Sequence, residues 1–259
     1  MPTPPPTYTT RLSATLWRYL TGGHHTDALT IHGHAHQAAH NTGDPTGQAD
    51  ALANLGAAFT RLGRHEQAAD HLRQALTMYR QAGDRTGEAS ALHNLGIIEK
   101  LLGGYCAAGD HYKQALTMYR QAGDRTGEAW VLNSLGTLHT CLGQPGQAIE
   151  HHQQALVIFR ETGDRDGGVF ALNGLGDAAH IADRPADALI QHTAAHTIAA
   201  GVGDRDQQAR AHTGLGHAHR TLNDPAHARW HYQQALTLYT DLGLPDADQV
   251  KAHLTAVTA

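Results

Sequence analysis

The chain of 259 residues is poor in aromatic side chains (5%) and contains two cysteines. It also lacks any apolar run close to the roughly 18 to 20 residues that span a bilayer, and its first ten residues carry no hydrophobic signal core. Neither a membrane protein nor a secreted one is predicted. Cys106 and Cys141 match no CxxC spacing, and we interpret them as reduced thiols in a cytoplasmic protein.

Charge and motifs exclude further classes of function. The formal net charge is −5 and no block of one sign occurs, which argues against direct nucleic-acid binding. No Gly-Lys dipeptide and no GxSxG elbow are present, so a phosphate-binding loop and a serine nucleophile are both absent. Glu88 and Glu128 recur near expected helix starts, where the helix dipole favours a carboxylate. We therefore expect no enzyme and no cofactor.

Histidine is abundant, with 22 residues. One helical turn separates the members of the series His32, His36, His40 and of the pairs His192/His196 and His227/His231. Two imidazoles at this spacing can chelate a transition metal. Because no obvious Cys, Asp or Glu completes a ligand set, the sequence predicts no functional metal site, and a weak adventitious Ni or Zn site stays open.

The strongest feature of the chain is repetition. The stretch QALTMYRQAGDRTGEA occupies residues 74–89 and again 114–129. Gly-Asp recurs at 43–44, 83–84, 123–124, 163–164 and 203–204, and Leu-Gly recurs at 55–56, 95–96, 135–136, 175–176 and 215–216. A fixed period of this length over five copies indicates a solenoid, in which each repeat buries its apolar face against its neighbours.

Each repeat contains two amphipathic segments. In residues 51–63 and 65–83, apolar side chains recur every three or four positions, which predicts two helices. Gly83 stands where a left-handed residue ends the second helix, and Asp84 can cap the next one. The turn inside a repeat is marked by Gly63, Gly103, Gly143 and the pair Asp224-Pro225. An all-α stack with short connections is therefore predicted.

These residues resemble the tetratricopeptide repeat. The pattern of the family falls on Leu52, Leu55, Gly56, Phe59, Ala68, Leu72 and Ala75, and it recurs in the four following repeats. The resemblance, to the forty-residue type, implies a right-handed superhelical solenoid of antiparallel helix pairs. Glycine at position 56 and its equivalents lets the two helices of a repeat cross closely, because it has no β-carbon.

The resemblance also divides the chain. We expect a flexible tail or linker (1–10), a divergent N-terminal helical unit (11–47), five repeats (48–87, 88–127, 128–167, 168–207 and 208–245) and a C-terminal capping helix (246–259). The amino-acid sequence of the repeats is similar to that of the C-terminal regions of actinobacterial regulators of the AfsR or SARP type and of NB-ARC ATPases. This similarity implies the sensor part of a bacterial regulator, either excised from it or a stand-alone relative.

In this family the first helix of each repeat lines a concave, ligand-binding surface. The candidate contact residues are Asn54, Asn94, Ile97, Lys100, Trp130, Asn133, Thr137, Phe170, Asn173, Asp177 and His180. A side-chain amide offers a donor and an acceptor, which suits it to the backbone of an extended peptide. The alternative for the asparagines is bonding between neighbouring helices. Trp130 and Phe170 could equally contact a ligand or pack across adjacent first helices.

We therefore expect a non-catalytic module that binds a protein segment or peptide in its groove. Two alternatives remain open: a receptor domain for a small molecule or peptide pheromone, and a scaffold for self-assembly. The second and fifth positions of the repeats supply no lysine, which argues against an acidic chaperone tail as the ligand. The oligomeric state is not predicted.

Overall fold

A computed structural model describes residues 25–258 of the chain. The expected tail at 1–10, residues 11–24 of the divergent unit and Ala259 lie outside the described residues. The described part consists of twelve helices and contains no strand. These are α3 (His25–Thr42), α4 (Pro45–Arg61), α5 (His65–Ala82), α6 (Arg85–Leu101), α7 (Tyr105–Ala122), α8 (Arg125–Cys141), α9 (Pro145–Thr162), α10 (Arg165–Ile181), α11 (Pro185–Val202), α12 (Arg205–Thr221), α13 (Pro225–Leu242) and α14 (Asp246–Thr258).

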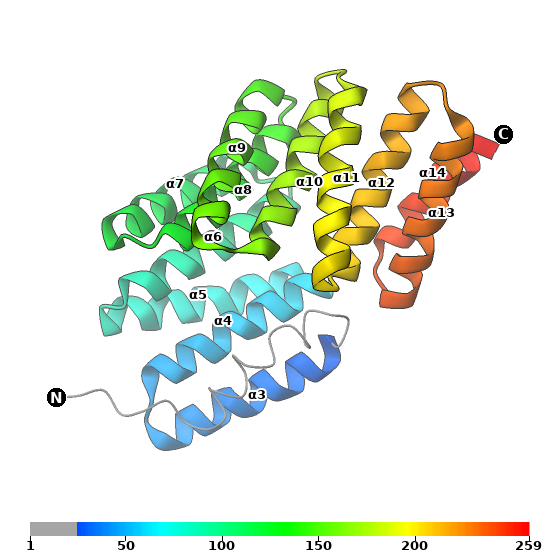
Figure 1. Cartoon of the computed structure of the whole chain (residues 1–259). Helices are drawn as coiled ribbons and strands as arrows, with labels where there is room; N and C mark the ends of the chain where they lie inside the picture. Colours follow the sequence, from blue (N-terminus) through cyan, green and yellow to red (C-terminus); the bar gives the residue numbers. More distant parts are fainter. Residues whose placement is uncertain (1–24, 259) are drawn as a thin grey trace. The chain divides into compact units, whose positions relative to one another are not determined.

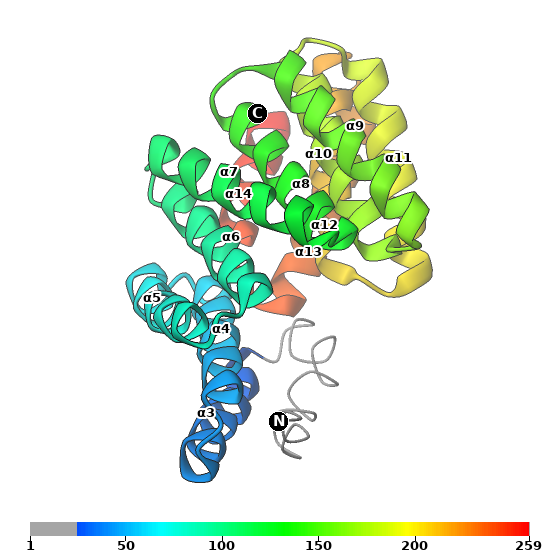
Figure 2. The ribbon, with the colours of Figure 1, turned by 90° about the vertical axis from the view of Figure 1, so that its left-hand side faces the viewer.

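The chain divides into two compact units, the first ending at Gly127 and the second beginning at Glu128. In Figure 1 the first unit holds α3 to α7 and the second holds most of α8 and all later helices. Within each unit, helices that follow one another in the sequence pack together, as Figure 2 shows for α4 to α7. This packing of consecutive helix pairs is that of a tetratricopeptide solenoid, and it confirms the predicted all-α class.

First and second helices of the repeats have different neighbours. The first helix α4 contacts the next first helix α6, and α10 contacts α12 in the same way. The second helices α5 and α11 pack instead against the first helix that follows each of them. The first helices thus form a continuous layer within each unit, which is the layer that the sequence assigned to ligand contact.

The connections between repeats follow the predicted chemistry. Gly83 ends α5 with φ of 70°, a left-handed conformation that costs glycine little. The Asp84 side chain accepts hydrogen bonds from the backbone N–H groups of Thr86 and Gly87, and so caps α6. Gly-Asp therefore closes one repeat and opens the next.

Turns inside the repeats also use a left-handed residue. Gly63, Gly103 and Gly143 have positive φ, as the sequence predicts. In the last two repeats the equivalent position holds Asp183 (φ 55°) and Asn223 (φ 58°), residue types that tolerate this conformation. The last turn was marked one residue late at Asp224-Pro225, because Asp224 is already the cap of α13.

Glycine is required where the two helices of a repeat cross. A β-carbon on Gly56 would lie 2.6 Å from Leu72 Cγ, and one on Gly96 would lie 2.5 Å from Tyr112 Cε1. Gly136, Gly176 and Gly216 are equally close to the residue at the position of Leu72. These distances are shorter than carbon contacts allow, which confirms the close helix crossing inferred from the sequence.

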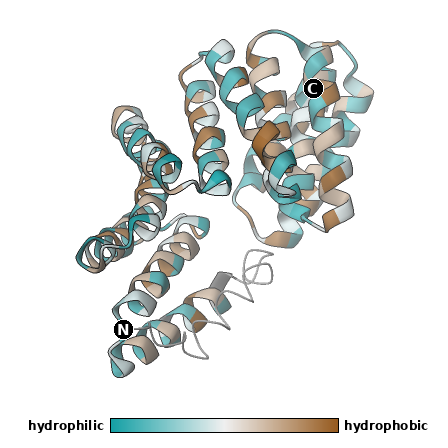
Figure 3. Ribbon diagram, turned by 60° about the vertical axis from the view of Figure 1, so that its left-hand side comes forward, coloured by the Kyte–Doolittle hydropathy of each residue, from teal (hydrophilic) through white to brown (hydrophobic). Residues whose placement is uncertain are grey.

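Hydropathy alternates along every helix, as the mixed brown and teal ribbons of Figure 3 show. The core consists largely of alanine and leucine. At the end of the second unit, α14 packs on α13 and buries Val250 against Tyr232 and Tyr239. None of the described helices combines the length and the apolar character that crossing a membrane requires.

Candidate functional site

In the first unit, four of the candidate residues lie on two adjoining first helices. Asn54 on α4 and Asn94 on α6 occupy the same position of successive repeats, and both side chains are half-buried. The Asn94 amide makes no hydrogen bond with another described residue. Ile97 and Lys100 follow Asn94 at three-residue intervals, so the three share one side of α6, and both are half-buried.

A neighbouring contact ties α4 to the second helix of its repeat. The Tyr79 hydroxyl donates a hydrogen bond of 2.7 Å to Asp50 Oδ1. Burial raises the pKa of Asp50, although the hydrogen bond from Tyr79 opposes that rise. Asp50 is therefore engaged inside its own repeat.

In the second unit, Trp130 and Phe170 pack together. The Trp130 ring lies 5.1 Å from the Phe170 ring and 5.1 Å from the buried Phe159 ring, in edge-to-face arrangements. Its indole N–H donates to Asp164 Oδ2 at 3.2 Å. Both Trp130 and Phe170 keep part of their surface exposed. They join α8, α9 and α10 and still present an aromatic surface.

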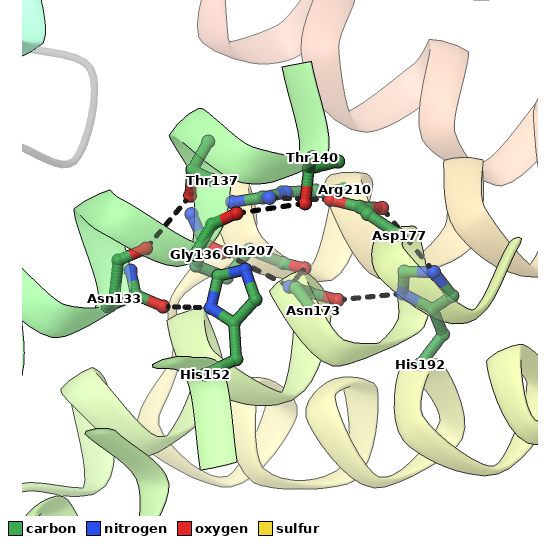
Figure 4. Close-up of polar contacts among 10 residues, drawn as sticks. All are labelled: Asn133, Gly136, Thr137, Thr140, His152, Asn173, Asp177, His192, Gln207 and Arg210. Carbon is green, nitrogen blue, oxygen red and sulfur yellow. Dashed lines mark hydrogen bonds and ion pairs between the residues drawn. The ribbon is translucent and has the colours of Figure 1, made fainter. Parts of the chain in front are cut away.

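Asn133 and Asn173 are held inside the helix pairs. His152 is completely buried, and its Nδ1 lies 2.8 Å from Asn133 Oδ1. In the next repeat His192 Nδ1 lies 3.1 Å from Asn173 Oδ1, while the Asn173 amide donates to Gln207 Oε1 at 3.1 Å. Figure 4 shows both asparagines directed at their histidines. These two amides serve contacts between helices.

An ion pair lies beside this network. Asp177 Oδ2 is 2.6 Å from Arg210 Nη2, and Asp177 Oδ1 is 3.5 Å from His192 Nε2 (Figure 4). Burial works to raise the pKa of Asp177, but the positive charge of Arg210 and its hydrogen bond to Asp177 outweigh burial and lower that pKa. Burial lowers the pKa of His192, so its imidazole is neutral near pH 7. The candidate Asp177 thus joins α10 to α12.

On α10 and α12, buried imidazoles require glycine at the position that Asn54 and Asn94 occupy on α4 and α6. A β-carbon on Gly174 would lie 2.2 Å from His152 Cε1, and one on Gly214 would lie 2.2 Å from His192 Nε2. No asparagine fits at either position while the histidine ring is present. The pair of half-exposed amides found on α4 and α6 therefore has no counterpart on α10 and α12.

The last two candidates lie near polar neighbours in the second unit. Thr137 is half-buried, and its hydroxyl donates to the Asn133 backbone carbonyl at 3.1 Å. The His180 ring stacks on His217 with centroids 5.6 Å apart. Burial, with a smaller effect from His253, lowers the pKa of His217 to about 4. Both imidazoles remain half-buried.

Two features of the surface escaped the sequence reasoning. Apolar side chains are exposed at the ends of first helices, including Leu102 (56%), Leu142 (43%) and Leu222 (45%). They lie forty or eighty residues apart, at the same position of their repeats, and this recurrence is visible in the sequence. The series His32, His36 and His40 does not form one exposed face, because His32 is buried and only His40 is exposed.

Comparison with known proteins identifies the repeat. The family model described as tetratricopeptide repeat matches residues 19–81, 87–161 and 169–241. No curated protein sequence matches the chain.

Several solved structures share the fold. A Rap protein complexed with competence and sporulation factor has a TM-score of 0.73 and 16% identity, over 96% of this chain and 70% of that one. BtubC (BKLC) from P. vanneervenii has a TM-score of 0.63 and 16% identity, over 92% and 93%. A signal transduction ATPase with numerous domains, which carries a tetratricopeptide repeat sensor and comes from Pyrococcus horikoshii, has a TM-score of 0.65 and 15% identity, over 96% and 38%.

Proteins of this repeat type are generally non-catalytic interaction modules. The family match extends over more than half of the sequence, and the structure has the same consecutive helix pairs. The chain belongs to the tetratricopeptide repeat family.

Proposed function

We propose that this chain is a non-catalytic module that binds an extended protein segment or peptide along its first helices. The observation that carries the proposal is the pair Asn54 and Asn94, which present half-exposed amides at equivalent positions of the contacting helices α4 and α6. Two amides in register can hydrogen-bond the backbone of an extended peptide independently of its side chains. Ile97 and Lys100 add an apolar and a basic contact beside Asn94.

This module serves, in our proposal, as the sensor part of a bacterial signalling or transcriptional regulator in the cytoplasm. Support comes from the similar fold of an ATPase whose tetratricopeptide repeats are a sensor. The sequence resemblance to actinobacterial regulators points in the same direction, and the two cysteines are free and exposed, which agrees with a reducing compartment.

The test is peptide selection on the immobilised chain, followed by affinity measurement on matched variants. Peptides recovered from a random displayed library are labelled and titrated with wild type, with Asn54→Ala/Asn94→Ala and with Gln74→Ala/Gln114→Ala. The control removes two amides that are also forty residues apart, but from exposed positions of the second helices α5 and α7. Circular dichroism establishes that each variant is folded.

Loss of two peptide hydrogen bonds should weaken binding by about 10- to 100-fold in the asparagine variant. The glutamine variant should bind like wild type. If no peptide is recovered, or if recovered peptides bind the asparagine variant as tightly as wild type, the first-helix amides of the first unit are not the binding site.

A second candidate function is reception of a small molecule or short peptide signal by the second unit. The half-exposed Trp130 and Phe170 rings favour it, because paired aromatic surfaces suit a compact apolar ligand. The similarly folded Rap protein is complexed with competence and sporulation factor. A ligand that raises the melting temperature of wild type but not of Phe170→Ala would favour this candidate over the extended peptide.

A further inference from the structure

The turn between α12 and α13 gathers three side chains of the kinds that bind metals. His219 belongs to the last turn of α12, Asp224 caps α13, and His227 stands in the first turn of α13. One ligand atom of each residue lies within 4.8 Å of those of the other two. Two imidazole nitrogens and a carboxylate oxygen therefore surround one common position.

The two oxygens of the Asp224 carboxylate have different partners. Its Oδ1 accepts the backbone N–H of His227 at 3.2 Å, which caps α13. Its Oδ2 lies 2.6 Å from His227 Nδ1 and 3.4 Å from His219 Nδ1. The cap orients the carboxylate, so Oδ2 is directed at both histidines without any further side-chain support.

We propose that His219, Asp224 and His227 bind one divalent transition metal ion, of which Zn²⁺ is the best match to this ligand set. Zn²⁺ takes histidine nitrogen and carboxylate oxygen at about 2.0 to 2.2 Å, so its ligand atoms lie about 3.3 Å apart in a tetrahedron. The His227 side chain is 67% exposed and free to rotate by the small amount that closes the site. The remaining coordination position is open to water.

Such an ion would join the end of α12 to the start of α13. It would stabilise the last helix pair, because a ligand that binds only the folded state adds to the free energy of unfolding. The two imidazole rings are already stacked, with centroids 5.0 Å apart and an interplanar angle of 24°, and belong to different helices. The role proposed for the metal is therefore to restrain this helix pair.

The equivalent turn two repeats earlier serves as an internal control for the proposed metal site. The equivalent turn, between α8 and α9, has His139, Gln144 and Gln147 in place of His219, Asp224 and His227. There His139 Nδ1 lies 2.7 Å from Gln144 Oε1, and the His139 ring stacks on His151 at 5.0 Å. Paired imidazoles are present, but the anionic ligand and the third position are not.

The experiment is calorimetric titration of ZnCl₂ into metal-free protein. The test variant is Asp224→Asn/His227→Gln, in which asparagine keeps the helix cap and glutamine copies Gln147. The control variant, His139→Gln/His151→Gln, also changes two side chains, the stacked imidazoles that join the end of α8 to α9. Other histidines bind Zn²⁺ weakly in all three proteins, so the informative quantity is the difference between them.

Wild type and the control should each bind about one equivalent of Zn²⁺ that the test variant binds at least about 10- to 100-fold more weakly. Zn²⁺ should raise the melting temperature of wild type and control, and raise that of the test variant less. Equal affinity and stoichiometry in wild type and test variant, or an equal loss in the control, would overturn the proposal. If the double variant is not helical, the exposed single substitution His227→Gln replaces it.

Discussion

The two compact units use the same helix pairs but fill the helix crossing with different chemistry. In the first unit the residues that face the crossing glycines are Leu72 and Tyr112. In the second unit the equivalent residues are His152 and His192, both completely buried, and Tyr232 follows in the last repeat. A buried imidazole loses its hydration, so it requires a hydrogen-bonding partner that leucine does not.

His152 and His192 each have a partner nineteen residues earlier. Asn133 serves His152 and Asn173 serves His192, while the corresponding positions of the first unit hold Ala53 and His93. The His93 ring meets Tyr112 edge to face at 5.8 Å. The residue at this spacing therefore differs with the core residue that it meets: alanine with leucine, histidine with tyrosine, and asparagine with histidine.

The buried histidines also restrict which side chains can stand on the adjoining first helices. Because His152 and His192 fill the space beside Gly174 and Gly214, no amide can stand there. In the first unit the same position is open to Asn54 and Asn94. In the second unit His152 and His192 therefore exclude an amide from the adjoining first helix, whereas in the first unit Asn54 is present although the residue equivalent to His152, His32, is also a buried histidine.

The largest expected effect comes from adding a side chain at the helix crossing. Gly96→Leu should lower the free energy of unfolding by about 3 kcal/mol through overpacking against Tyr112. Gly176→Leu should cost about 1 to 2 kcal/mol more, because displacing His192 also breaks its bond to Asn173. Urea unfolding followed by circular dichroism measures both.

The matched control for these substitutions is Gly146→Ala. A β-carbon there meets no atom within 4 Å, and the residue lies in α9. Alanine should therefore stabilise the chain by about 0.5 to 1 kcal/mol through helix propensity. Equal destabilisation by Gly96→Leu and Gly176→Leu would show that the polar network of the second unit adds nothing to the cost.

The next largest expected effect is the difference in stability between replacing a buried asparagine and replacing a half-exposed one. Asn173→Ala should lower the free energy of unfolding by about 2 to 3 kcal/mol, because it leaves groups of His192 and Gln207 buried without their hydrogen bonds. Asn94→Ala should change it by less than about 0.5 kcal/mol. Thermal and urea unfolding of the two variants give the comparison, and similar losses in both would contradict it.

The smallest effect is a dependence on pH. Burial lowers the pKa of His192, and burial with the neighbouring His196 lowers the pKa of His212 to about 4. The unfolded chain therefore binds protons first as the pH falls below about 6.5, and the stability present above that pH is lost progressively towards pH 4. The first unit has a similar group in His93, whose pKa burial lowers to about 4.

On α12 both His212 and His217 have a pKa lowered to about 4, and His192 lies on the adjoining α11, whereas α6 carries His93. We therefore expect α10 and α12 to lose at least about 1 kcal/mol more protection than α4 and α6 between pH 7 and pH 5. Hydrogen exchange followed by mass spectrometry, corrected for the intrinsic effect of pH on exchange, resolves the helices separately. An equal loss in both units would mean that the buried imidazoles of the second unit do not govern its acid sensitivity.

Much of the fold could be predicted because its signals are local. Gly83 and Asp84 act through a backbone dihedral angle and one cap, both of which depend on a few adjacent residues. The left-handed residues Asp183 and Asn223 were missed since neither is glycine. The ligand-binding role of Asn54 and Asn94 stays a prediction.

The site was harder to predict because its contacts cross between helices. Asn173 has the residue type and the register of a ligand-facing amide, yet its partners are His192 and Gln207 on two other helices. From the sequence we considered histidines one turn apart on a single helix, whereas His219, Asp224 and His227 come together across a turn between two helices. The partners of Asn173 have no signature in local spacing, whereas the three metal-ligating residue types lie within nine residues of sequence and could have been recognised by reading across the turn.

The sequence by itself determined the period of forty, the two helices of each repeat, their caps and the glycine at their crossing. These features follow from backbone preferences and from the regular recurrence of apolar side chains. Only the tertiary structure decided which polar side chains are buried and which face outwards. That choice depends on the volume and hydrogen-bonding groups of residues on neighbouring helices, which are distant in the sequence and close only after the helices pack.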